Sequence, residues 1–212
     1  MAVAENMHSN RVLNLGSAIE YARGRLASEI PSSMPYHGLA HTERDVVPVV
    51  ERLAATLGIA GRPVELLRTA AWFHDIGYIE QYGKNEGIAV RIARGVLPAL
   101  GYGDDDLDTI ETIIDATRLP QCPRGLLAEI MADADLYVLC SAYFLDRNHA
   151  LRAEFEAQGI TYDDVTWWRD QLRFVQNHRY FTTAALAEAA LGKATNIEAL
   201  QRRLLVAEAR AR

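Results

Sequence analysis

The stretch Ala71-Trp72-Phe73-His74-Asp75-Ile76-Gly77 constrains the fold most, because it places two polar side chains directly behind an apolar run. Residues 63–73 show the periodicity of a helix with a broad apolar face, and Gly77 predicts a left-handed helix end. His74 and Asp75 are therefore expected in the last turn of a helix that faces the core. A buried carboxylate is costly without a partner. The pair thus requires a backbone cap, a mutual hydrogen bond or a metal ion.

The rest of the chain is helical nearly throughout, and no segment shows the alternation of a half-buried strand. Pro48 is expected to kink its helix or mark a junction, and Asp104 and Thr161 are expected at helix N-caps. The fold class is therefore all-α, as one domain over residues 1–212 without internal repeats. The expected helices cover residues 14–29, 39–57, 63–73, 85–99, 104–117, a long segment from 124 as far as 158, 162–176, 183–191 and 195–210.

Composition excludes several classes of protein. The net charge is -6, and no run of Lys or Arg suggests a nucleic-acid partner. Cys122 and Cys140 are too few for a disulfide framework and lack zinc spacing. The first eleven residues are polar, unlike a secretion signal, and no apolar stretch is long enough for a bilayer. We expect a cytoplasmic protein without membrane contact, compatible with a small phosphorylated substrate and with a homo-oligomer.

Two further segments place polar side chains in apolar helical surroundings. In YHGLAH, His37 and His41 are four residues apart and would share a helical face. In MADADL, Asp133 and Asp135 lie about 200° apart around a helix, so at most one faces the core and the other is a surface residue or a supporting one. Two imidazoles and two carboxylates from three helices suit a divalent metal with open positions for water. Each residue taken singly has an ordinary alternative, such as a helix cap or an arginine partner.

The order His41, His74-Asp75 and Ala134-Asp135 resembles the HD superfamily of metal-dependent phosphohydrolases. YHGLAH is similar to the family's YHNxxH opening, HDIGY to its HDIG, and ADADLYVL to its DADL helix. The resemblance covers about residues 30–145. It implies an HD-domain-like helical bundle with the metal site between core helices, on which the helices of residues 160–212 would pack.

The resemblance also implies roles for individual residues. His37 would face the substrate as a general acid, and Asp75 would take part in catalysis. From their positions alone, Arg118 at a helix end and Lys84 in the loop after His74-Asp75 are candidates to contact phosphate, unless they are ordinary solvated cations. The apolar neighbours of Asp135 favour it over Asp133 as a ligand. The implied metal ligands are His41, His74, Asp75 and Asp135.

This chain departs from the family pattern at several positions. Tyr78 stands where some members have Glu or Lys, and either Glu80 or Glu86 would have to replace that group. Binuclear members carry two more histidines, where this chain has Asn85 and Asp115. We therefore expect one divalent ion per chain, its identity open among Mn, Co, Ni, Mg, Zn and Fe.

The function that the resemblance implies is hydrolysis of a small phosphoester, such as a nucleotide or cyclic nucleotide, by metal-activated water. Two alternatives remain: a regulatory domain that binds metal or nucleotide with weak turnover, and a diiron oxygenase of the same superfamily. Other conspicuous side chains are interpreted as packing (Trp167, Trp168, Tyr143 and Phe144) or receive no role (His149 and His178).

Overall fold

The computed structural model describes residues 12–212, and within that range the protein is all-α without any strand, as the sequence predicts. The polar stretch 1–11, on which the expectation of no secretion signal rests, lies outside the described residues. No helix between residues 12 and 212 combines the length and apolarity needed to cross a membrane. The elements in chain order are α1 (Leu15–Glu29), the π-helical η1 (His41–Val46), α2 (Val47–Thr56), α3 (Arg62–Phe73), the 3₁₀ turn η2 (Ile76–Ile79), α4 (Glu86–Val96), the 3₁₀ turn η3 (Leu97–Leu100), α5 (Asp104–Asp115), α6 (Leu126–Asp135), the 3₁₀ turn η4 (Tyr137–Cys140), α7 (Phe144–Ala157), α8 (Asp164–Asn177) and α9 (Thr183–Arg210).

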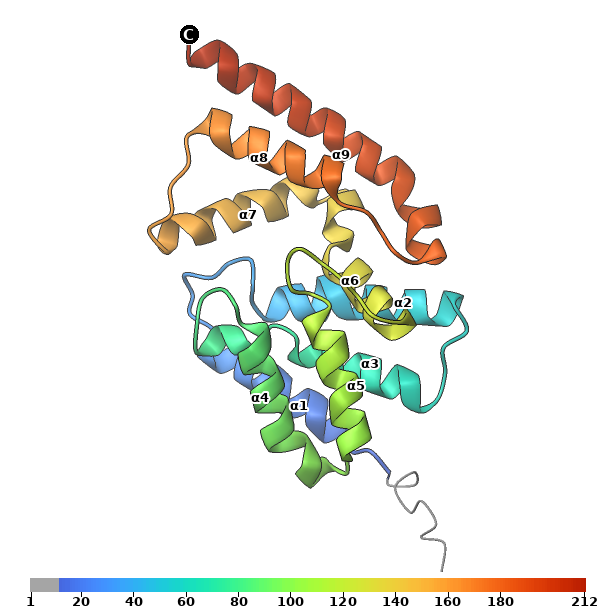
Figure 1. Ribbon diagram of the computed structural model, residues 1–212. Helices are drawn as coiled ribbons and strands as arrows, with labels where there is room; N and C mark the ends of the chain where they lie inside the picture. Colours follow the sequence, from blue (N-terminus) through green and yellow to red (C-terminus); the bar gives the residue numbers. More distant parts are fainter. Residues whose placement is uncertain (1–11) are drawn as a thin grey trace, which may run out of the picture.

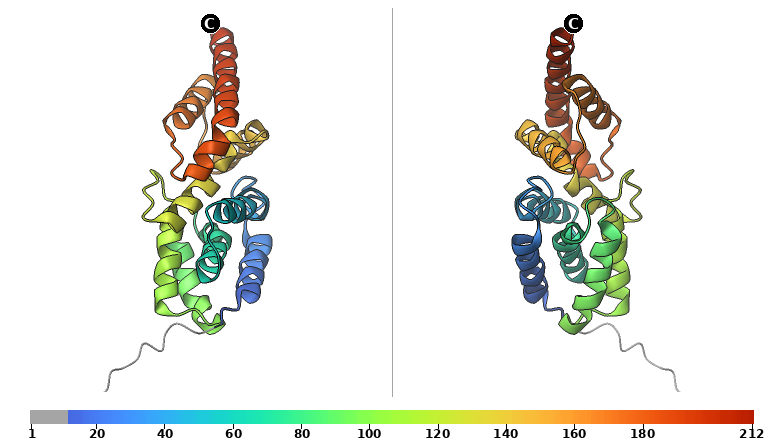
Figure 2. Two further views of the ribbon diagram at one scale, coloured as in Figure 1. Left: turned by 90° about the vertical axis from the view of Figure 1, so that its right-hand side faces the viewer. Right: turned by 90° about the vertical axis from the view of Figure 1, so that its left-hand side faces the viewer.

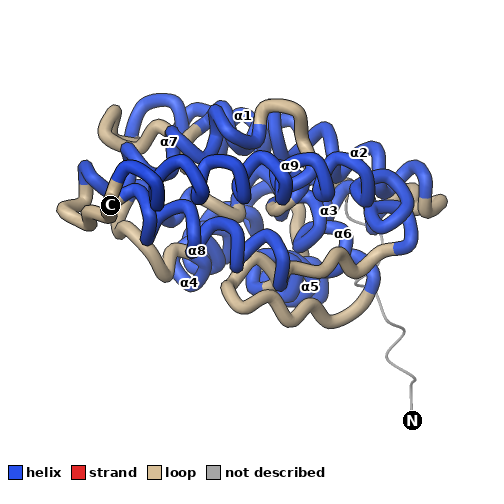
Figure 3. Tube along the Cα trace, turned by 90° about the horizontal axis from the view of Figure 1, so that it is seen from above, coloured by secondary structure: helices blue, strands red, loops and turns tan. Residues whose placement is uncertain are grey.

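The helices form a bundle of α1 to α6 and, above it, a layer of α7 to α9 (Figure 1). The side views show that the two parts stack along the long direction of the molecule (Figure 2). Seen from above, α8 and α9 run side by side across the bundle (Figure 3). The polar segments singled out in the sequence all lie in the bundle or at its upper edge.

Two hydrophobic clusters correspond to these two parts. The larger fills the bundle and includes Phe73, while the smaller lies among η4, α7, α8 and α9 around the buried Trp167. Helix α9 belongs to both, because Ala185 packs in the bundle cluster and Leu200 in the upper one. Packing is thus confirmed for the tryptophan pair, whereas Tyr143 is exposed and its predicted packing is wrong.

The long helix expected from residue 124 to 158 is divided. Helix α6 ends at Asp135, the turn η4 follows, and α7 begins at Phe144. The break frees backbone carbonyl groups, and Asn196 of α9 donates to two of them, those of Leu139 (3.0 Å) and Ser141 (2.9 Å). A side chain about 55 residues away in the sequence therefore stabilises a break that local periodicity does not indicate.

The two helices expected at 183–191 and 195–210 are one continuous helix, α9. Gly192, which falls in the gap between the two expected helices, lies inside it. A Cβ atom at this position would lie 2.0 Å from the carbonyl oxygen of Cys140. Glycine is required there because α9 approaches the backbone of η4 closely.

Several helix ends differ in detail from the expectation. The N-cap of α5 is Gly103, whose N–H donates to Asp106, and that of α8 is Asp163; neither is Asp104 or Thr161. Pro48 lies at the start of α2 directly after η1, which confirms the predicted junction.

Gly77 does not adopt the predicted left-handed conformation. Its position instead allows a close approach, since a Cβ atom there would lie 2.1 Å from the carbonyl oxygen of Asn85. The chain after α3 thus comes into contact with the residue that precedes α4, which brings Asn85 next to Asp75.

Candidate metal centre

His74 and Asp75 follow α3 at the centre of the molecule. His74 is fully buried, and its Nδ1 lies 2.8 Å from the carbonyl oxygen of Ala71, to which it donates. The Nε2 atom is then the nitrogen left with a lone pair. Asn85 donates from its amide to Oδ1 of Asp75 (3.1 Å) and to the carbonyl of His74 (3.2 Å). These bonds fix both side chains and leave His74 Nε2 and Asp75 Oδ2 facing the same space.

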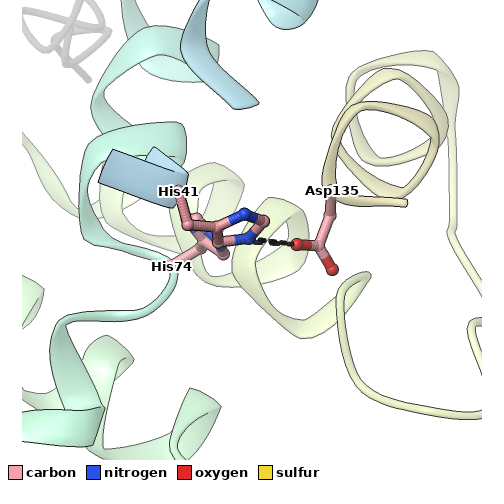
Figure 4. A group of neighbouring side chains, drawn as sticks. All are labelled: His41, His74 and Asp135. Carbon is pink, nitrogen blue, oxygen red and sulfur yellow. Dashed lines mark hydrogen bonds and ion pairs between the residues drawn. The ribbon is translucent and has the colours of Figure 1, made fainter. Parts of the chain in front are cut away.

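His41 and Asp135 close this space from two other elements. His41 comes from η1, and Asp135 is the last residue of α6. Figure 4 shows the two histidine rings lying together, with the Asp135 carboxylate facing them from the opposite side. His41, His74 and Asp135 each offer a ligand atom, and these atoms lie within 4.8 Å of one another. This group can hold a metal ion.

The distances between the possible ligand atoms are close to those expected around a single metal ion. Nε2 of His41 lies 3.2 Å from Asp135 Oδ1 and 3.6 Å from Asp75 Oδ2. Nε2 of His74 lies 3.2 Å from Asp75 Oδ2 and 3.6 Å from Asp135 Oδ1. Adjacent ligands at about 2.1 Å from one ion are about 3.0–3.4 Å apart. The two 3.2 Å separations match this spacing, and the two 3.6 Å separations are slightly longer. Asp75 lies beside both histidines, while His41, His74 and Asp135 are the three residues whose ligand atoms all lie within 4.8 Å of one another.

Buried polar atoms without hydrogen-bond partners also favour a cation in the cluster. His74 Nε2 and Asp75 Oδ2 are buried and accept no hydrogen bond. Buried polar atoms of this kind cost free energy unless a partner compensates them. A cation between the two imidazoles and the two carboxylates satisfies both atoms at once.

The electrostatics also favour positive charge at this position. Burial would lower the pKa of His41 and His74, but the neighbouring carboxylates outweigh it and raise both. Burial would likewise raise the pKa of Asp75 and Asp135, but the histidines outweigh it and hold both below their usual range. The two carboxylates thus attract a cation to the imidazole nitrogens, either a proton or a metal.

Asp133 points away from the cluster, as its angular separation from Asp135 predicts. It is fully buried, so a surface position for it is wrong. Its carboxylate accepts from the backbone N–H groups of Phe181 and Thr182, both at 2.8 Å, and from the Thr182 hydroxyl at 2.7 Å. Asp133 therefore holds the segment that begins α9.

His37 lies beside the cluster but outside any helix, so the idea that it shares a helical face with His41 is wrong. Its Nδ1 contacts a carboxylate oxygen of Glu154. The other oxygen of that carboxylate accepts from the backbone N–H groups of Tyr36 and His37, both at 2.9 Å. The ring of Tyr78 stacks on the His37 ring with centroids 4.5 Å apart. These contacts fix the His37 ring, and none of them involves its Nε2 atom.

The carboxylate of Asp45 lies on the side of the His41 ring that faces away from Asp75 and Asp135. Asp45 Oδ2 lies 3.5 Å from His41 Nδ1, and Arg147 Nε lies 3.0 Å from the same oxygen. Arg147 also donates to the carbonyl of Tyr36 (2.8 Å) and covers its ring. Metal-binding histidines commonly direct their second nitrogen to such a carboxylate.

The cluster opens into a cavity of about 720 Å³ between the bundle and the upper layer. Asp75, Asp135 and His37 line it, and so do the two predicted phosphate contacts, Lys84 and Arg118. Arg118 also pairs with exposed Asp115 (2.9 Å). Both cations therefore line the same cavity as Asp75 and Asp135.

The positions at which the chain departs from the family pattern have other partners. Asn85 supports Asp75, and Asp115 pairs with Arg118, so neither contributes to a second group of ligands within residues 12–212. Of the two acids considered in place of Tyr78, Glu80 pairs with an arginine on the surface. Glu86 lines the cavity instead, and its Oε2 is buried without a hydrogen bond.

Sequence reasoning missed three residues of this region: Asp45, Arg147 and Glu154. Asp45 carried a usable signal, because it stands four residues after His41 and so one turn away. Arg147 and Glu154 carried none, since a charged residue in α7 looks like part of an ordinary solvated face.

Comparison of the chain with protein-family models, with curated proteins and with solved structures finds no match in any of the three. The assignment of a function therefore depends on the residues and the geometry of this site.

Proposed function

We propose that the protein is a metal-dependent phosphohydrolase of the HD type that cleaves a small phosphoester. The observation that supports it most is a pair of imidazoles beside a cavity, each with its Nε2 atom 3.2–3.6 Å from a carboxylate oxygen of Asp75 and of Asp135. When bound there, a divalent cation supplies Lewis acidity to a water molecule and to the phosphoryl oxygens. His41, His74, Asp75 and Asp135 are the residues that would hold it.

The remaining steps belong to side chains around the cavity. Lys84 and Arg118 bind and orient the phosphoryl group by charge. Water adds to phosphorus and releases a proton to the solvent, the bond from phosphorus to the leaving oxygen breaks, and His37 Nε2 gives its proton to that oxygen. The His37 ring then regains a proton from the solvent. Glu154 holds His37 through Nδ1 and stabilises the protonated ring before transfer.

A second candidate function is a regulatory domain that binds metal or nucleotide and turns over weakly. One observation favours it: Tyr78 lies flat on the His37 ring, in the position where an acid or lysine acts in other members. A phenol at this place offers neither a base nor a permanent charge for phosphate.

Metal content and hydrolysis measured on the same preparation separate the two candidates. We expect a chelator to abolish the hydrolysis found with a panel of phosphoesters, nucleotides and cyclic nucleotides among them, and added Mn²⁺, Co²⁺, Ni²⁺ or Mg²⁺ to restore it. His41→Ala should lose the metal. His37→Ala should retain it and turn over about 10²–10⁴-fold more slowly. Full activity in metal-free protein contradicts the proposal, and bound metal without any turnover favours the regulatory domain.

A further inference from the structure

The cavity has two chemically different ends. Towards the bundle it presents Asp75, Asp135, His37 and the two cations, Lys84 and Arg118. Towards the upper layer its wall is formed by η4, α7 and α8. The apolar side chains of this wall are Val138, Leu139, Phe144, Leu151, Phe155 and Phe174, which together define what we call the apolar chamber.

The polar residues of the chamber are largely occupied with one another. The Asn148 amide donates to the Gln171 carbonyl (2.6 Å), and the Asn148 carbonyl accepts from the Trp167 indole (2.9 Å). Arg147 is engaged by Asp45 and by the Tyr36 carbonyl. A hydroxyl-rich group placed here would lose hydrogen bonds to water without finding equivalent partners.

The size of the cavity exceeds what the reacting group requires. A volume of about 720 Å³ lies within the range of about 300–1,000 Å³ that is typical of sites for whole organic ligands. A phosphoryl group and one ion occupy the polar end only. The chamber therefore has room for the organic part of the ligand.

We propose that the apolar chamber binds the leaving group of the substrate, and that this group is an apolar alkyl or aryl alcohol rather than a sugar or a polyphosphate. This inference rests on the proposed phosphohydrolase function, because it takes the polar end as the place of the phosphoryl group. Transfer of non-polar surface from water into the chamber supplies the affinity, and the two cations orient the phosphate.

Phe174 offers a variant with a matched control. Its side chain lines the chamber and is 36% exposed, so truncation costs little stability. Phe181 has the same exposure of 36% but lies outside the cavity. Leu151→Ala provides a second change within the wall.

The first experiment measures binding of naphthol, which has no phosphate, to the full chain by calorimetry. We expect saturable binding that Phe174→Ala and Leu151→Ala weaken by about three- to tenfold and that Phe181→Ala leaves unchanged. No saturable binding, or equal weakening by Phe174→Ala and Phe181→Ala, overturns the inference.

The second experiment compares hydrolysis of hexyl phosphate and glycerol phosphate, whose leaving groups are both primary alcohols. We expect kcat/KM for hexyl phosphate to be at least about tenfold higher, and Phe174→Ala to reduce that preference. Equal kcat/KM values overturn the chamber while the phosphohydrolase function stands. Naphthol binding with the expected variant pattern, in protein that hydrolyses no phosphoester, upholds the chamber as an apolar site and overturns the function.

Discussion

Asp133 and Asp135 show how two identical side chains, two residues apart, take different roles. Asp135 faces the histidines, whereas Asp133 binds the backbone at the start of α9. We expect Asp135→Asn to reduce metal affinity sharply in a titration. Asp133→Asn should leave metal affinity nearly unchanged and lower the free energy of unfolding by about 1–3 kcal/mol, because its amide would face N–H donors. The reverse ranking in the metal titration would place Asp133 among the ligands.

Glu154 is expected to act through His37 alone. Burial opposes its ionisation, but the hydrogen bonds from His37 and the backbone hold its pKa below the usual range. Glu154→Gln should keep the metal and lower kcat by about 10–100-fold, with a changed pH–rate profile.

The control for this prediction is Glu156→Gln, which alters an exposed neighbour on the same helix. A double variant with His37→Ala should be no slower than His37→Ala itself, because the two residues act as one unit. Additive losses in the double variant would show that Glu154 has only a structural role.

At this scale the sequence identifies the residues that the fold brings together, namely His41, His74, Asp75 and Asp135, because each polar residue interrupts an apolar pattern. It does not predict Glu154. A glutamate within the polar sequence of α7 carries no sign that its helix folds back onto residues more than 100 positions earlier. Long-range pairing of this kind is visible only in the fold.

The turn η4 and the middle of α9 form one structural unit, in which Gly192 admits the Cys140 carbonyl and Asn196 bonds the released carbonyls. Gly192→Ala should lower the free energy of unfolding by about 1–3 kcal/mol in denaturant titration, although alanine favours a helix. Gly24→Ala is the matched control, because nothing lies within 4 Å of its Cβ position in α1. This variant should gain up to about 1 kcal/mol. A gain in both variants would contradict the close packing of α9.

The sequence misjudges both ends of this unit for the same reason. The run from Leu126 to Leu145 is apolar enough to continue a helix, and Gly192 looks like a helix breaker. Each conclusion is correct for an isolated segment. The contact between η4 and α9 overrides both preferences. The chain breaks at η4, and α9 continues through Gly192 because the missing side chain leaves room for the η4 backbone.

The whole molecule should show a pH dependence of stability that traces to His178. Burial and the nearby charges of Lys193 and Arg179 lower its pKa from 6.5 to about 4. The unfolded chain then binds more protons between these values, so stability is complete above about pH 6.5 and falls as the pH drops towards 4. The loss should amount to about 2–3 kcal/mol.

Denaturant titrations at several pH values test this prediction. His178→Asn removes the titrating ring, so its stability should fall less steeply than that of the wild type between pH 6.5 and 4. Parallel slopes in the two proteins would mean that His178 contributes nothing to the acid sensitivity.

Helix α9 packs in both hydrophobic clusters, with Ala184 and Ala185 in the bundle and Leu200 and Ala207 above it. Its 28 residues make a rod about 42 Å long that runs across the bundle (Figure 3) and packs against both parts. The walls of the cavity between those parts are consequently preorganised before any ligand arrives. A ligand of the right shape loses little free energy to rearranging them. A branched isomer would have to displace the walls, which costs free energy. Selection between linear and branched molecules therefore follows from the rigidity of α9, a helix that does not line the cavity.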